Sequence, residues 1–92
     1  MLGIRDELPG WELIDPEVFA KPKHHSVVIM GCYWIVIDGR IAFRKVNGCL
    51  DAIFTEHKQL ADKIAGQIRL NHHADVEVKQ FDALYIPAEY MF

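Results

Sequence analysis

The sequence predicts an α+β domain with two layers, in which an antiparallel sheet of three to five strands carries one main helix on one face. Three observations lead to this fold class. Runs of β-branched residues indicate strands, an Asp-Gly pair between two apolar runs indicates a tight hairpin, and one apolar stripe at helical spacing indicates a helix. Each such element must bury its apolar face against another element, which favours stacked layers.

Residues 1–24 are expected to form an arm ahead of a single α+β domain at 25–92. Three of the four prolines stand in the arm, six or seven residues apart, and each proline removes a main-chain donor and disfavours a long helix. Asp15 and Pro16 would suit the start of one short helical turn. We favour instead an irregular arm, held against the body by two aromatic side chains, Trp11 and Phe19.

The pair Asp38-Gly39 is the sharpest turn signal, because the central positions of a type I′ hairpin turn favour these residues. With this pair as the loop, the expected register runs from Ile37–Arg40 through Trp34–Phe43 to Tyr33–Arg44. Side chains alternate across a strand, so one face of this hairpin is wholly apolar and is expected in the core: Trp34, Val36, Ile41 and Phe43. Gly31 separates the hairpin from an earlier strand-like run, Val27–Ile29, and either turns the chain or bulges one strand.

The chain after the hairpin predicts a helix and one more strand. From Glu56 the apolar positions recur at helical spacing, with Thr55 as the expected cap and Asn71 at the end: Leu60, Ala61, Ile64, Ala65 and Ile68. Asp75–Phe81 alternates between polar and apolar residues, as a half-buried strand does. Residues 82–92 form an apolar tail.

Charge changes sign along the chain, although the net charge is only −3. Residues 1–20 hold five acids and one base, residues 21–50 hold five bases and one acid, and residues 51–92 hold seven acids and four bases. The basic part coincides with the second face of the hairpin, which mixes apolar residues with two arginines and is expected to be only partly covered. The predicted binding residues are four residues of this face and the base that follows them in the chain: Tyr33, Ile35, Arg40, Arg44 and Lys45.

Arg and Tyr favour binding because they combine a large contact area with a polar group. In the expected register Tyr33 stands opposite Arg44, an arrangement that would allow a cation–π pair.

No motif assigns a catalytic residue, a cofactor or a metal. The sequence has neither phosphate-binding glycine motif, and its only serine, Ser26, cannot face its neighbour His25 along an extended chain. The doublets His24-His25 and His72-His73 would each offer at most one metal ligand for the same reason. A zinc site at the two doublets remains a minor hypothesis.

Compartment is predicted from the cysteines and the apolar runs. Cys32 and Cys49 lie in apolar stretches and are interpreted as small core residues with free thiols. The first residues lack the pattern of a secretory signal, and the longest apolar run, Val27–Ile37, is too short to cross a bilayer. We therefore expect a cytoplasmic protein without a membrane partner.

Three functions are compatible with these features. The first is a non-catalytic binding module that contacts protein through the hairpin face or the apolar tail, in its simplest form as a homodimer; an accessory protein or inhibitor from a mobile element would be of this type. The alternative is contact with nucleic acid through the basic hairpin inside a larger complex. The third is a small metal-dependent or hydrolytic enzyme.

Overall fold

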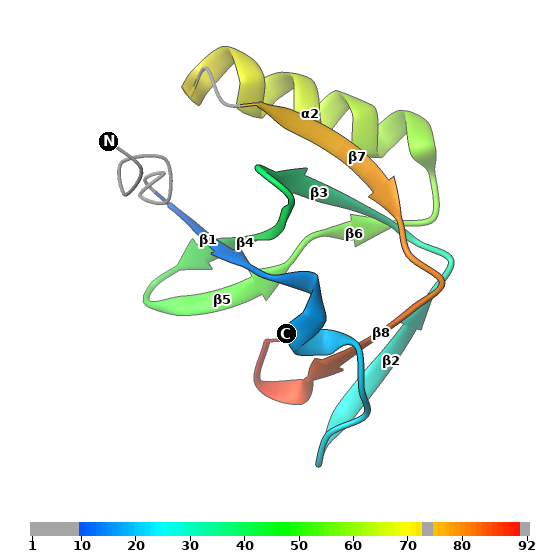
Figure 1. Ribbon diagram of the computed structural model, residues 1–92. Coiled ribbons are helices and arrows are strands. Elements are labelled where there is room, and N and C mark those ends of the chain that lie inside the picture. Colours follow the sequence, from blue (N-terminus) through cyan, green and yellow to red (C-terminus); the bar gives the residue numbers. More distant parts are fainter. Residues whose placement is uncertain (1–9, 73–74, 91–92) are drawn as a thin grey trace.

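The computed structural model describes residues 10–72 and 75–90. In these residues the chain forms one α-helix, eight strands and two short 3₁₀ helices (Figure 1). The elements in chain order are β1 (Trp11–Ile14), η1 (Pro16–Phe19), β2 (Ser26–Met30), β3 (Tyr33–Ile37), β4 (Arg40–Val46), β5 (Cys49–Ala52), β6 (Phe54–Thr55), α2 (Lys58–His72), β7 (Val76–Gln80), β8 (Ala83–Pro87) and η2 (Ala88–Tyr90).

The main sheet contains six antiparallel strands, which is more than the three to five predicted. β4 pairs with β1 along one edge, and along its other edge it pairs first with β3 and then with β5. β3 pairs with β7 along one edge, and with β4 and then β6 along the other. The additional strands come from β1 and from the β5–β6 segment, where the alternation in the sequence is too short to be distinctive.

The Asp38-Gly39 hairpin forms with the predicted register at its tip only. Ile37 pairs with Arg40 and Val36 with Ile41, and both loop residues have a positive φ. Beyond that point the strands separate, because β4 turns to pair with β5 while the start of β3 pairs with β6. The predicted pairing of Tyr33 with Arg44 is therefore wrong.

β2 and β8 form a second sheet of two strands, which we call the β2–β8 ribbon. Its register continues that of β3 and β7: Tyr33 pairs with Gln80, and Met30 pairs with Ala83. Two residues on each strand lie between these pairs, so no residue is inserted, and Gly31 marks a corner rather than a hairpin turn or a bulge. Its φ of 68° bends the chain there, and its carbonyl accepts a hydrogen bond from Gln80 Nε2 at 2.8 Å.

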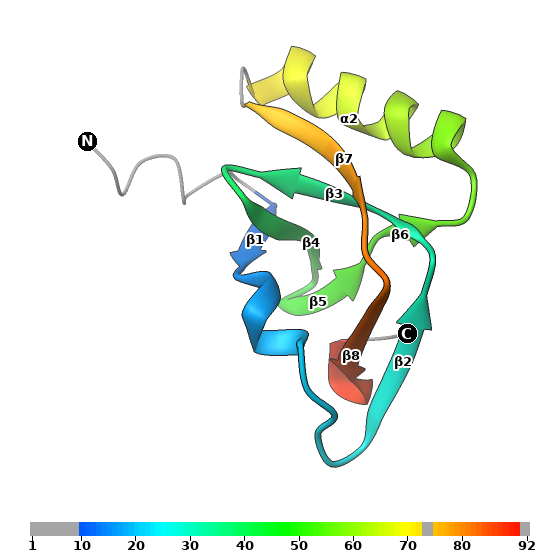
Figure 2. The ribbon, with the colours of Figure 1, turned by 45° about the vertical axis from the view of Figure 1, so that its right-hand side comes forward.

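Two apolar cores cover the two faces of the main sheet. One core lies between the sheet and α2, and the other lies between the sheet and the β2–β8 ribbon, closed by η1 and η2 (Figures 1 and 2). The predicted core face of the hairpin is confirmed as buried: Trp34, Val36, Ile41 and Phe43. Because the ribbon adds a layer opposite the helix, two layers do not describe the whole structure.

The described part of the predicted arm contributes regular structure. Trp11–Ile14 is strand β1 of the main sheet, so an irregular course is wrong for this segment. The alternative, a short helical turn, is present as η1, where the Asp15 carboxylate accepts a hydrogen bond from Glu17 N at 3.0 Å and Pro16 begins the turn. Phe19 is fully buried in the second core, in ring contact with Phe43 and Tyr90.

The predicted helix and the strand after it are both present, with small differences at their ends. α2 starts at Lys58, where Leu60 N and Ala61 N donate to the His57 carbonyl. Thr55 lies before the helix, where its hydroxyl accepts from His57 N at 3.1 Å. The buried stripe of the helix is narrower than predicted and consists of Ala61, Ala65 and Ile68, while Leu60 is 47% exposed. Two of these three are alanines, whose small side chains let the helix approach the sheet closely.

Candidate functional site

The hairpin face predicted to bind a partner is covered by α2. Ile35 is 1% exposed and belongs to the core beneath the helix, together with Ile37 and Ala42. The two arginines on this face had suggested that it was only partly covered. They stand at its two ends, whereas the residues between them are apolar and buried.

Tyr33 and Arg44 lie apart in the pairing pattern and interact with other residues. Tyr33 is half-buried and pairs with Thr55 on one side and with Gln80 on the other. The Arg44 guanidinium instead lies over the ring of Trp11, 5.8 Å from its centroid, and Trp11 is its neighbour in β1. A cation–π contact therefore exists, but β1 supplies the aromatic ring.

Lys45 and Arg40 complete the predicted set at two further places. Lys45 follows Arg44 directly in β4, so its side chain leaves from the opposite face of the strand. Its Nζ lies 3.3 Å from Glu12 Oε1. Arg40 begins β4, about 13 Å along the strand from Arg44. The five predicted residues therefore do not form one continuous surface.

The histidine and cysteine side chains that the structure describes do not gather in one cluster. His24 and His25 are adjacent in the turn before β2, with ring centroids 4.0 Å apart, while His72 ends α2 and His73 lies outside the described residues. Among the residues that the structure describes, no group of three or more His, Cys, Asp or Glu side chains is placed to hold a metal ion.

Cys32 is half-buried and Cys49 is exposed, so the interpretation of Cys49 as a core residue is wrong. Cys49 directly follows the Asn47-Gly48 turn between β4 and β5. An open pocket of about 270 Å³ lies there, lined by Val46, Asn47, Cys49 and Asp51. The described polar groups of this lining all come from one short hairpin.

Among the described residues, β2 carries more exposed large apolar side chains than any other element. Met30 is 69% exposed, Val28 is 47% exposed and Val27 is 41% exposed. Cross-strand partners share a face of a sheet, so Val28 and Met30 lie on the outer face of the β2–β8 ribbon with their partners Tyr85 and Ala83. Neither strand of the ribbon contains a charged residue.

The β2–β8 ribbon packs against the body of the protein through its inner face, and its outer face is exposed. Leu84 and Ile86 are buried in the second core, and Ile29 packs against that core. A two-stranded ribbon has only two faces, and the body covers one of them. The apolar tail noted in the sequence supplies β8, and its pairing with β2 depends on a corner that the sequence pattern does not reveal.

The chain matches no protein-family model, no curated protein and no solved structure. Within the described residues, the structure has no helix with the length and apolar character needed to cross a membrane.

Proposed function

We propose that this protein is a non-catalytic interaction module that binds protein through the outer face of the β2–β8 ribbon. The observation that carries the proposal is the exposure of Val28 and Met30 on β2. Neither β2 nor its partner strand β8 contains a charged residue. Burying uncharged apolar surface against another apolar surface is favourable, because both surfaces are then removed from water. A contiguous patch of this kind is typical of protein contact sites.

A protein partner fits this face better than nucleic acid does, because phosphate contacts require cationic side chains. The ribbon provides none on either strand. In the basic hairpin, Lys45 pairs with Glu12 and Arg44 lies over Trp11, so contact with phosphates would compete with interactions inside the chain.

Photo-crosslinking tests the proposal at single positions. We would replace Met30 with p-benzoylphenylalanine, irradiate the full chain in a lysate of its native host, and identify the crosslinked species by mass spectrometry. Leu70 is the matched control, because it is 75% exposed and apolar but lies on α2. We expect crosslinks to protein at position 30 and not at position 70. Nuclease treatment should leave these crosslinks unchanged.

Equal crosslinking at positions 30 and 70 would contradict the proposal, because the ribbon would then be no more reactive than any exposed apolar position. Crosslinks at position 30 that disappear after nuclease treatment would favour nucleic-acid contact instead. The experiment does not require the partner to be known, and a second copy of the chain counts as a protein partner in it.

A further inference from the structure

We infer that the open edge of β2 binds a second copy of this chain, so that two β2 strands pair edge to edge, antiparallel, about a two-fold axis that passes beside Val28. This inference goes beyond the proposed function, because it uses the edge of β2, whereas the outer face of the ribbon stays available to a protein partner. The product is a continuous sheet of four strands, in the order β8, β2, β2 and β8, shared between the two copies.

The edge of β2 is open to a further strand. Within the described chain β2 pairs with β8 alone, and in both ribbon views β2 lies at the periphery of the molecule with β8 on its inner side (Figures 1 and 2). Edge strands in proteins are usually protected from pairing by charge, by proline or by a bulge. β2 reads Ser-Val-Val-Ile-Met and contains none of these devices.

The hydrogen-bonding pattern shows which main-chain groups face this open edge. Ala88 N donates to the His25 carbonyl at 2.8 Å, so the main-chain groups of His25 point toward the β8 side. Main-chain groups alternate direction along an antiparallel strand, so those of Ser26, Val28 and Met30 point away from β8. The N–H of Ser26 is already engaged with the Lys23 carbonyl, at 3.1 Å.

A two-fold axis beside Val28 places these groups opposite suitable partners. Val28 would exchange both main-chain hydrogen bonds with Val28 of the second copy. The N–H of Met30 would donate to the Ser26 carbonyl of the second copy. Ser26 would therefore contribute only its carbonyl to the pairing, since its N–H is hydrogen-bonded to Lys23. On the outer face the cross-strand row would read Tyr85, Val28, Val28 and Tyr85, and pairs of aromatic and β-branched residues stabilise sheets.

Charge at the two ends of β2 favours the antiparallel arrangement. Lys21 and Lys23 precede the strand and are exposed, whereas the exposed Asp82 lies at the corner beside the other end of the strand, between β7 and β8. An antiparallel pair sets the basic end of one copy beside the acidic corner of the other. A parallel pair would set the two basic ends together, and like charges repel. The two-fold arrangement also closes after two copies, which limits growth into fibres.

Sedimentation velocity over a range of concentrations tests the inference. The chain of 10.6 kDa is expected to double in mass as its concentration rises. Val28→Lys and Val28→Glu would each place two like charges directly opposite one another, so each variant alone is expected to stay monomeric. An equimolar mixture of the two places Lys opposite Glu and is expected to recover the doubled mass.

Leu70→Lys is the matched control, because it adds the same charge at an exposed position on α2 and is expected to dimerise like the parent chain. Amide exchange gives a measurement that needs no substitution. The amides of Val28 and Met30 should become protected as concentration rises, whereas those of Val27 and Ile29, which face β8, should be protected throughout.

A parent chain that stays monomeric at every concentration would overturn the inference, as would a dimer that Val28→Lys leaves intact. If crosslinking at position 30 still captures another protein in that case, the proposed function survives and only the pairing of two β2 strands fails. If position 30 captures nothing selectively, the proposed function fails as well.

Discussion

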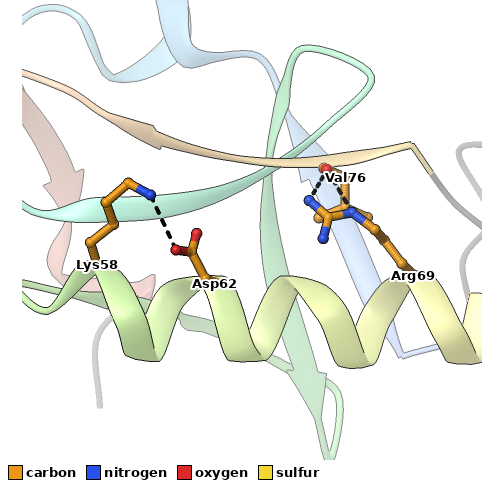
Figure 3. A network of polar contacts seen from close by, with 4 residues as sticks. All are labelled: Lys58, Asp62, Arg69 and Val76. Atoms are coloured by element: carbon orange, nitrogen blue, oxygen red, sulfur yellow. Dashed lines mark hydrogen bonds and ion pairs between the residues drawn. The ribbon is translucent and has the colours of Figure 1, made fainter.

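Arg69 donates two hydrogen bonds to the main-chain carbonyl of Val76, from Nε at 3.1 Å and from Nη2 at 2.6 Å (Figure 3). This contact joins the last turn of α2 to the first residue of β7. A cation in the last turn also interacts favourably with the negative end of the helix dipole. The contact therefore holds the helix in place over the buried core that Ile35 and Ala65 share.

We expect Arg69→Ala to lower the free energy of unfolding by about 2 kcal/mol, because hydrogen bonds to a charged group in a partly buried place are among the stronger ones. Urea denaturation measures this change. Lys58→Ala is the matched control on the same helix, since its ion pair with Asp62 is exposed and is worth at most about 0.5 kcal/mol. An equal decrease in the free energy of unfolding in both variants would show that the hydrogen bonds of Arg69 to Val76 contribute no more than an exposed ion pair.

Gly31→Ala should destabilise the protein by about 1 kcal/mol, because Gly31 has a φ of 68°, which a residue with a Cβ adopts at a cost. No atom lies within 4 Å of the added Cβ, so the backbone alone produces the effect. Gly66→Ala is the matched control: the space around Gly66 is equally open, but it lies within α2, where alanine should stabilise by about 0.5–1 kcal/mol. Thermal denaturation should give opposite signs, and shifts of equal sign would contradict the corner assigned to Gly31.

His25→Gly should raise the melting temperature. His25 has a φ of 60° in the Lys23–Ser26 turn, a conformation that glycine adopts without strain. The gain should be at most about 1 kcal/mol, or several degrees for a domain of this size. His24→Gly is expected to lower stability, because His24 is not among the residues with positive φ and glycine there only adds freedom to the unfolded chain. A stabilising His24→Gly would count against this explanation.

Phe19→Ala should cost about 3–5 kcal/mol, because Phe19 is fully buried and its removal leaves a cavity beside the rings of Phe43 and Tyr90. The neighbouring residue Val18 is 41% exposed, so Val18→Ala should change stability by less than about 1 kcal/mol. Chemical denaturation compares the two. A small effect of Phe19→Ala would mean that η1 does not contribute to the second core.

Local patterns predicted several elements with good bounds. The Asp38-Gly39 turn, the strand at Val76–Gln80 and the helix over most of its length follow from turn chemistry and periodicity alone. The apolar face of the hairpin was correctly placed in a core, because a wholly apolar face has no other stable location.

The candidate site could not be predicted in the same way. Ile35 shares its face of the hairpin with two arginines, which suggested an open face, but α2 from later in the chain covers it. The exposed Met30 and Val28 lie on a strand that looks like any buried strand in the sequence. Exposure depends on which elements come together, and a pattern within one element does not contain that information.

The sequence by itself determined where strands, turns and the helix form, because propensity, turn chemistry and periodicity act over a few residues. Only the tertiary structure decided that Gly31 bends a long ladder into two sheets, so that the tail pairs with β2 and one apolar face remains exposed. The physical reason is that burial is a property of the assembled layers. The residues of an uncharged strand such as β2 are compatible with the centre of a sheet and with its edge, and only the path of the whole chain distinguishes the two.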